Sequence, residues 1–298
     1  MRAAWATDIH LRFCDDDERR DFYRTLADTP FDILLLTGDI GGESDLGGLP
    51  EPLDHSETVR HLKELEENVR RPIYFVLGNH DYYRSSMAVV RTAVAALCRG
   101  SRMLHFVQEE GVVALTERTA LVGHECWGDA GWGDFESSPV LMNDWKVIWD
   151  LKQYWSRLSD LTVDLMPWKL KKNDLDQSAL AQRLKALGED AAEHFRRVLP
   201  DALARYERVV VLAHVPPFVK DYPRPWGPRP EDHLPVGACR AAGDALLEIA
   251  ARFPDRQIRI LAGHIHHRQE FRVANNITMS IGHAELMAPG VESVLEIL

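Results

Sequence analysis

Cysteine is scarce in this sequence, and it never occurs in a metal-binding or disulfide pattern. The four cysteines, Cys14, Cys98, Cys126 and Cys239, are scattered, and no Cys-x-x-Cys pair is present. Thiols spaced in this way are typical of free cysteines in a reducing compartment. The lack of cysteines beside the other polar motifs also excludes a thiolate-based metal site.

Long apolar runs are missing as well. No apolar stretch approaches the roughly 18 residues that a membrane-spanning helix needs. Residues 1–8 lead directly into a polar motif and contain no apolar segment of the kind found in signal peptides. We therefore expect a soluble cytoplasmic protein.

Basic residues are outnumbered by acidic ones. The chain has 298 residues, with 35 Lys and Arg against 46 Asp and Glu, so its formal charge is −11. A protein of this charge has no overall attraction for nucleic acid or for an anionic membrane. We therefore expect a small substrate, and neither nucleic acid nor a membrane as a partner. The length suits one large α/β domain with a substantial core.

Short apolar runs alternate with amphipathic segments. Runs rich in leucine and β-branched residues predict buried strands at 3–7, 33–37, 73–77, 209–213 and 258–262. Apolar residues at three- and four-residue spacing predict helices at 15–27, 56–68 and 85–97, the first of which opens with acidic residues. Further strands are expected at 271–273, 277–281 and 291–298. The alternation indicates an α/β fold.

Five short polar islands follow the predicted buried strands. In an open α/β sheet, ligands bind beyond the carboxyl ends of the strands, so these side chains should meet at one edge. Residues two apart in an extended segment face the same side, which pairs Asp8 with His10 and His264 with His266. The islands are Asp8-Ile9-His10, Gly38-Asp39, Gly78-Asn79-His80-Asp81, Ala213-His214 and Gly263-His264-Ile265-His266.

The islands supply Asp, Asn and His side chains, a donor set for two metal ions that share one carboxylate. Asp39 is suited to be that anionic bridge. Mixed imidazole and carboxylate ligands favour Mn, Fe or Zn, and also Co or Ni, over Ca. Two cations about 3.5–4 Å apart can clamp a phosphate ester and activate water, so this composition indicates displacement at phosphorus. Gly38, Gly78 and Gly263 are expected to form turns with unusual backbone angles.

The motif series D-x-H, G-D, G-N-H-D, H and G-H-x-H resembles the calcineurin-like metallophosphoesterase family, over nearly the whole chain from Asp8 to His266. The resemblance implies a two-sheet α/β sandwich flanked by helices, a four-layer αββα fold, with residues 1–298 as a single domain. It also implies metal-dependent hydrolysis of phosphate esters at a binuclear centre, with a metal-bridging hydroxide as the nucleophile.

The same resemblance implies roles for individual residues. His80 would stand near the leaving-group oxygen as a general acid or charge stabiliser, and Asp81 would orient or charge His80. Asp39 would bridge the two ions. The first ion would be held by Asp8, His10 and His266, and the second by Asn79, His214 and His264.

A tryptophan-rich segment at about 124–187 is not explained by the resemblance. We expect an insertion that covers one edge of the site. Its rings would form either the core of an inserted helical subdomain or a cap that stacks on a base or another flat leaving group. In the second case His124, Trp127 and Trp132 would contact the substrate. The tryptophans of the segment are Trp127, Trp132, Trp145, Trp149, Trp155 and Trp168.

The proline-rich stretch 216–235 is predicted to be an irregular loop that rims the site. Its Lys220, Arg224 and Arg229 either contact a second phosphate or are solvated. Three functions stay open: a phosphomonoesterase or phosphodiesterase acting on a small molecule such as a nucleotide, a protein phosphatase or nuclease of the same family, and a non-catalytic scaffold. Exposed tryptophans would equally suit a subunit contact, so the oligomeric state stays open too.

Overall fold

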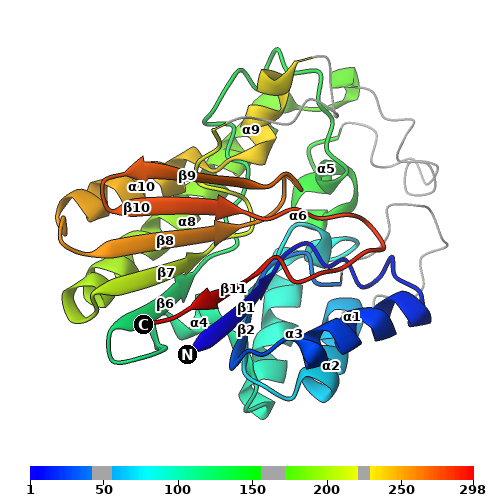
Figure 1. The fold of residues 1–298 in the computed structure, drawn as a ribbon. Coiled ribbons are helices and arrows are strands. Elements are labelled where there is room, and N and C mark those ends of the chain that lie inside the picture. Colours follow the sequence, from blue (N-terminus) through cyan, green and yellow to red (C-terminus); the bar gives the residue numbers. More distant parts are fainter. Residues whose placement is uncertain (42–55, 156–171, 221–228) are drawn as a thin grey trace.

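The computed structural model of the chain describes residues 1–41, 56–155, 172–220 and 229–298, and Figure 1 shows its fold. Its strands are β1 (Arg2–Ala6), β2 (Ile33–Thr37), β3 (Ile73–Val76), β4 (Leu104–Phe106), β5 (Val113–Ala114), β6 (Thr119–Gly123), β7 (Arg208–Leu212), β8 (Gln257–Ala262), β9 (Gln269–Ala274), β10 (Ile277–Ile281) and β11 (Ser293–Glu296). They form sheet A, in the order β11-β1-β2-β3-β4, and sheet B, in the order β5-β6-β7-β8-β10-β9.

Both sheets are mixed. Most neighbouring strands run parallel, but β11 is antiparallel to β1, β5 to β6 and β9 to β10. Because β1 pairs with β11, the two ends of the chain lie side by side (Figure 1). The parallel strands at the centre of each sheet point their carboxyl ends the same way, which is what brings the polar islands to one edge.

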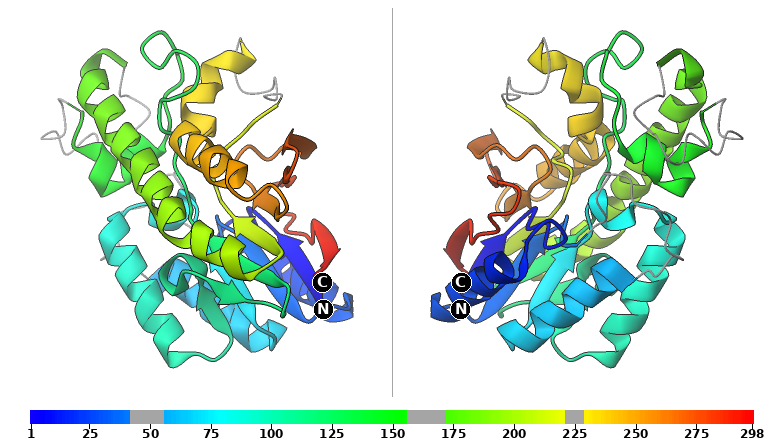
Figure 2. Two further views of the ribbon diagram at one scale, coloured as in Figure 1. Left: turned by 90° about the vertical axis from the view of Figure 1, so that its left-hand side faces the viewer. Right: turned by 90° about the vertical axis from the view of Figure 1, so that its right-hand side faces the viewer.

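Helices cover the outer face of each sheet, as Figures 1 and 2 show. The helices of the described residues are α1 (Asp16–Asp28), α2 (Ser56–Val69), α3 (Met87–Gly100), α4 (Val107–Glu110), α5 (Asp144–Val147), α6 (Trp149–Lys152), α8 (Gln177–Arg205), α9 (Leu234–Gly237) and α10 (Arg240–Ala251), with the 3-10 turns η1 (His80–Tyr82), η3 (Lys172–Asp174) and η5 (Pro230–His233). Helices α1, α2 and α3 pack on sheet A, and α8 and α10 pack on sheet B. The predicted two-sheet α/β sandwich flanked by helices is confirmed.

Side-chain alternation along the strands divides the core. Trp5 of β1 points into the seam between the sheets, in one cluster with Val210 and Leu261 of sheet B. Its neighbour Ala4 points the other way, into the cluster that includes α1, α2 and α3. Every residue of β2 is buried. Strands buried on both faces have continuous apolar sequences, which is why these strands could be predicted.

Several predicted boundaries hold closely. Strands at 33–37 and 277–281 are found at those positions, and the helix expected at 15–27 is α1. Its N-cap is Asp15, whose carboxylate accepts the backbone N–H groups of Asp17 and Glu18 at 2.9 Å each. The acidic start of this helix is therefore a capping arrangement that stabilises its first turn.

The tryptophan-rich segment differs more from expectation. Helix α8 begins inside it but continues to Arg205, well past the expected end of the insertion at 187. Leu180 and Leu184 join the core of sheet A, whereas Phe195 and Leu199 join the core of sheet B. One unbroken apolar stripe therefore ties the segment to both sheets. Trp168 lies outside the described residues. No helix in the described part of the chain is long and apolar enough to cross a membrane.

Asp129 joins the segment after β6 to two helices. Its carboxylate accepts the N–H of Gly131 at 2.9 Å and that of Ala241, in the first turn of α10, at 2.7 Å. The side chain is buried and lies against Gly188 of α8. A Cβ atom at position 188 would come within 2.5 Å of the Cβ of Asp129, so only glycine allows this contact.

We expect Gly188→Ala to lower the free energy of unfolding by about 1–3 kcal/mol, because overpacking outweighs the gain in helix propensity. Gly100→Ala, at the end of α3, is the matched control. A Cβ there meets nothing within 4 Å, so this variant should be neutral or stabilised by up to about 1 kcal/mol. Urea and thermal denaturation measure both. Equal effects would show that Asp129 does not restrict the helix.

Candidate metal centre

Polar side chains from both sheets meet where the parallel strands end. Asp39 follows β2 and Asn79 follows β3 in sheet A, while His214 follows β7 in sheet B. Backbone hydrogen bonds join the turns: the N–H of Asp8 donates to the carbonyl of Gly38 at 3.1 Å, and that of Gly263 to the carbonyl of His214 at 3.0 Å. The structure thus brings the five polar islands together at the seam between the sheets.

The backbone of these turns is not extended, contrary to expectation. Asp8, His10 and Asp39 have φ angles of 48°, 42° and 50°, and His264 and His266 have 70° and 51°. The left-handed region costs a non-glycine residue roughly 1–2 kcal/mol. The expected pairs do converge, but through tight turns and not along an extended segment. Strain of this kind persists only where the surrounding structure holds it in place.

The motif glycines are required mainly because a side chain would not fit at their positions, and less because of their backbone angles. Only Gly38 has a left-handed φ, of 92°, so the expectation of unusual angles is wrong for Gly78 and Gly263. A Cβ at position 78 would lie 2.2 Å from Oδ1 of Asp39, and one at position 263 would lie 2.1 Å from Oδ2 of Asp8. The two carboxylates rest directly on the backbone of the neighbouring turns, where no side chain fits.

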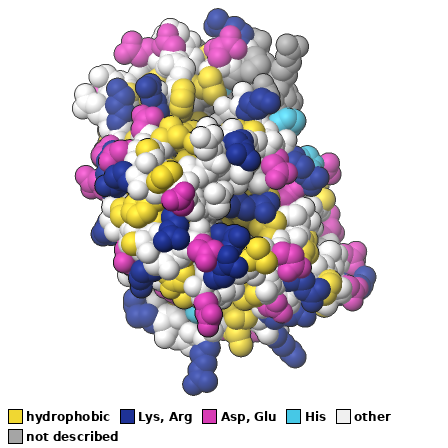
Figure 3. All heavy atoms as spheres, turned by 60° about the vertical axis from the view of Figure 1, so that its left-hand side comes forward, with side chains coloured by type: hydrophobic (Ala, Val, Ile, Leu, Met, Phe, Trp, Pro, Cys, Tyr) yellow, Lys and Arg dark blue, Asp and Glu magenta, His cyan; other side chains and the backbone are white. Residues whose placement is uncertain are grey.

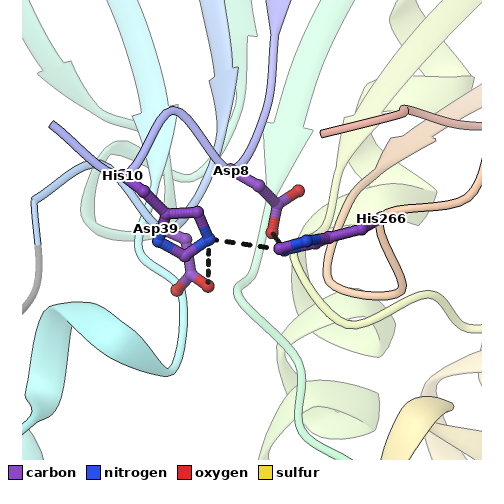
Figure 4. Close-up of side chains that lie close together, drawn as sticks. All are labelled: Asp8, His10, Asp39 and His266. Carbon is purple, nitrogen blue, oxygen red and sulfur yellow. Dashed lines mark hydrogen bonds and ion pairs between the residues drawn. The ribbon is translucent and has the colours of Figure 1, made fainter. Parts of the chain in front are cut away.

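Asp8, His10, Asp39 and His266 form a first group, with one donor atom from each within 4.8 Å of the others (Figure 4). Nε2 of His266 lies 3.3 Å from Nε2 of His10 and 3.3 Å from Oδ1 of Asp8. Nε2 of His10 lies 3.7 Å from Oδ2 of Asp39. Imidazole nitrogens and carboxylate oxygens that converge in this way fit a transition-metal ion.

Asn79, His214 and His264 form a second group beside the first. Oδ1 of Asn79 lies 2.8 Å from Nε2 of His214 and 3.0 Å from Nδ1 of His264. Nε2 of His214 lies 3.5 Å from Oδ1 of Asp39. Asp39 therefore presents one carboxylate oxygen to each group. The pair His264 and His266 is divided between the groups.

Burial sets the protonation state of these side chains. It lowers the pKa of His10 and of His264 to about 3, so both rings are neutral at neutral pH and keep a lone pair for a metal ion. Burial also raises the pKa of Asp39 above its ordinary value, and the charges of Asp8 and Asp81 raise it further. A cation among these groups would oppose that effect and favour the ionised carboxylate.

His80 lies at the border of the first group. Its ring centroid is 4.8 Å from that of His10 and 4.3 Å from that of Tyr83, on which it stacks. Within the described residues, the buried Nδ1 of His80 has no hydrogen-bond partner. A buried nitrogen left in this state is a candidate to bind a ligand.

Asp81 has a different position from the one expected. Its carboxylate accepts the N–H groups of Ile40, Gly41 and Gly78 at 3.1, 3.0 and 2.9 Å. These bonds hold the turn after β2 against the turn after β3. The carboxylate makes no hydrogen bond to the His80 ring, so Asp81 does not orient the ring through a direct bond, and an effect on the charge of His80 stays a prediction.

Sequence analysis missed Asp144, which lies in α5 within the tryptophan-rich segment. Its buried carboxylate accepts a hydrogen bond from Nδ2 of Asn79 at 2.9 Å and one from the hydroxyl of Tyr83 at 2.7 Å. Neither spacing nor a motif marks this acid, and the one hint is its place beside buried Trp145. The segment thus reaches the metal-binding region through a side chain that was not singled out.

Two of the three expected substrate contacts lie in the interior. His124 is 2 % exposed, and its Nδ1 accepts the N–H of Cys126 at 3.0 Å. Trp127 is 4 % exposed, and its indole N–H donates to the carboxylate of Glu125 at 3.2 Å. Both polar groups are bonded within the protein. Trp127 nevertheless lines a small cavity together with Asn79 and His264, and a substrate contact by either residue stays a prediction.

Trp132 remains exposed, at 37 %. It lines an open groove of about 610 Å³ that also includes Phe218 and Lys220, and the groove does not include the grouped Asp, Asn and His residues. Arg229 lies near Asp232, with 3.5 Å between Nε and Oδ2. Arg224 lies outside the described residues.

Comparisons with known proteins agree with the fold and the motifs. The structure is similar to the phosphopantetheinyl hydrolase of Mycobacterium tuberculosis, with a TM-score of 0.53 and 15 % identity over 96 % of this chain and 89 % of that one. It is similar to a dimetal phosphatase from Danio rerio, with a TM-score of 0.53 and 15 % identity over 96 % of this chain and 88 % of that one. No curated protein matches the chain in sequence. The model of the calcineurin-like phosphoesterase family matches residues 1–268, which include every polar island, and the chain therefore belongs to that family.

Proposed function

We propose that the chain hydrolyses small phosphate esters at a binuclear metal centre. The position of Asp39 carries this proposal: Oδ2 lies 3.7 Å from Nε2 of His10, and Oδ1 lies 3.5 Å from Nε2 of His214. A carboxylate that faces two donor groups is suited to two cations at close range. Membership of the phosphoesterase family and the dimetal phosphatase among the similar structures support the same function.

The donor atoms suggest how the ions would be held. All are nitrogen or oxygen, which favours Mn, Fe or Zn. When bound, the ions would supply Lewis acidity at the phosphate and an activated water as nucleophile. Asp39 would contact both ions. The first ion would be held by Asp8, His10 and His266, and the second by Asn79, His214 and His264.

His80 is the group best placed to contact the reacting ester. Burial lowers its pKa, and positive charge on His10 would lower it further, so the ring is neutral in the ion-free protein. A neutral imidazole carries one N–H, which can donate to the leaving-group oxygen or to a phosphate oxygen. A bound phosphate dianion would favour the protonated ring and hence proton donation to the leaving group.

A small ester suits the surface better than a nucleic acid. On the face shown in Figure 3, basic and acidic side chains are interspersed and do not gather into a basic stripe. The formal charge of −11 adds an overall repulsion toward polyanions.

The first test is an assay of purified protein with Mn²⁺, using p-nitrophenyl phosphate in one arm and bis-p-nitrophenyl phosphate in the other. We expect cleavage in at least one arm, loss of activity after chelation, and recovery when Mn²⁺ is returned, since the ions supply the Lewis acidity. Faster diester cleavage would indicate a phosphodiesterase, and faster monoester cleavage a phosphatase. Two bound ions without cleavage of these or other small esters would contradict the proposal.

Asp39→Asn should lose both ions under dialysis and lower the rate by more than about 10³-fold, because a bridging charge worth several kcal/mol is removed. Elemental analysis and the ester assay measure the two effects. His267→Ala is the control, since this exposed histidine lies beside His266 but outside both groups. Full metal content in Asp39→Asn would refute the bridging role.

His80→Ala should keep both ions and lose about 10²–10⁴ in rate, the range typical of a general acid. The loss should shrink along a series of aryl phosphates as the phenol becomes a better leaving group. An equal loss for good and poor leaving groups would instead assign His80 to charge stabilisation at the phosphate.

A further inference from the structure

We propose that Asp144 is a positioning residue that orients both Asn79 and His80, an inference that rests on the proposed function. Asp144 is 5 % exposed, although a carboxylate is costly to bury without strong partners. Its Oδ1 accepts two hydrogen bonds, from Nδ2 of Asn79 at 2.9 Å and from the hydroxyl of Tyr83 at 2.7 Å. Both donors belong to the turn after β3, which carries a proposed metal ligand and the proposed leaving-group contact.

The first hydrogen bond selects one orientation of the Asn79 amide. An amide has an oxygen at one end and an NH₂ group at the other, and a half-turn of the side chain exchanges them. A carboxylate accepts hydrogen bonds and cannot donate them, so Asp144 holds the NH₂ group on its own side. Oδ1 then faces His214 and His264, at 2.8 and 3.0 Å. Without Asp144, the amide loses the partner that distinguishes its two ends.

The second hydrogen bond reaches His80 through Tyr83. The phenol ring stacks on the imidazole with centroids 4.3 Å apart and 26° between the planes, and its hydroxyl lies 3.5 Å from Nε2 of His80. Because Asp144 holds the hydroxyl, the far end of the phenol stays in place, and the ring keeps its stacked position against the imidazole. One carboxylate oxygen therefore sets the orientation of two groups with different proposed tasks.

The backbone near Asp144 is bonded to the segment that follows η1. The N–H of Arg84 donates to the carbonyl of Val147 at 3.0 Å, and the N–H of Trp149 donates to the carbonyl of Ser85 at 3.0 Å. Both bonds lie just after Tyr83 and Asp144 in the chain, so they hold the two segments together and limit the distance between these residues.

Buried tryptophans hold the other side of α5. The indole N–H of Trp155 donates to the carbonyl of Trp145 at 2.7 Å, and the Trp145 ring meets Phe135 edge to face. Both indoles are buried. This part of the tryptophan-rich segment is thus a small core that keeps Asp144 in place.

Calorimetric titration of the full chain with Mn²⁺ tests the inference without relying on catalysis. We expect Asp144→Ala to weaken one of two Mn²⁺ sites by about 10–100-fold, the effect typical of losing a hydrogen-bond partner of a ligand, and to leave the other site unchanged. Asp144→Asn keeps the volume and serves if the alanine variant does not fold. It should show the same pattern in weaker form, because a neutral acceptor bonds less strongly than a carboxylate.

Tyr83→Phe separates the orientation of His80 from the orientation of Asn79. It should keep both Mn²⁺ affinities but lower turnover by about 10- to 10²-fold on aryl phosphates with poor leaving groups, as expected for a misplaced catalytic group. Esters with good leaving groups should be affected less. Adding Tyr83→Phe to His80→Ala should cause little further loss, because the phenol would act only through the imidazole.

Asp150→Ala is the matched control. Asp150 lies in the same segment and accepts the N–H of Met87 at 2.8 Å, and neither residue belongs to the two donor groups, so its loss should leave both Mn²⁺ affinities unchanged. Parent-like binding by Asp144→Ala and Asp144→Asn, or equal weakening in Asp150→Ala, would overturn the inference. A parent protein that binds two Mn²⁺ ions but cleaves no ester would overturn the proposed function alone, since the affinities of the variants still report on Asp144.

Discussion

Buried carboxylates that accept backbone N–H groups are the interaction on which this site depends. Asp8, at the end of β1, accepts the N–H of His264 at 3.1 Å and so joins sheet A to sheet B at their open edge. Asp39, in the turn after β2, accepts the N–H of His80 at 2.8 Å. Asp81, in the turn after β3, accepts N–H groups of the turn after β2, so the two turns are bonded in both directions. Such charge-assisted bonds are strong in a dry interior, and they hold the left-handed backbone of the proposed ligand residues.

The same bonds make this part of the protein depend on cations. Three backbone N–H groups partly oppose the rise that burial causes in the pKa of Asp81, whereas His80 supplies the N–H bond to Asp39, and three acids, Asp8, Asp81 and Asp144, act against its ionised form. The raised pKa of Asp39 shows that burial and crowding oppose the ionised form when no cation is present. A metal ion would remove this conflict, so ion binding and the stability of the turns should be linked. Sites that store strain and unbalanced charge are characteristic of function.

The sequence predicted the positions of site residues well where these residues directly follow a buried strand. The runs before Asp39 and His264 predicted both the sheet and the edge where the proposed ligands lie, because strands buried on both faces have continuous apolar sequences. The sequence was a poor guide to contacts made across the chain. Asp144 lies 65 residues from Asn79, and no periodicity links them. Nor could spacing show that Asp8 and Asp39 occupy the space where side chains at 263 and 78 would stand.

The buried indoles of the tryptophan-rich segment fit the first of the two alternatives, an inserted core, and stacking on a substrate stays a prediction. The segment also contacts the turn after β3 at two consecutive tyrosines. The hydroxyl of Tyr82 donates to Glu125 at 2.6 Å, and that of Tyr83 donates to Asp144 at 2.7 Å. The two acceptors stand at different points of the segment, so the turn that carries His80 is held between them. A segment bonded in this way cannot swing aside without releasing the turn. A displacement of Glu125 or Asp144 would therefore act on the turn that carries Asn79 and His80.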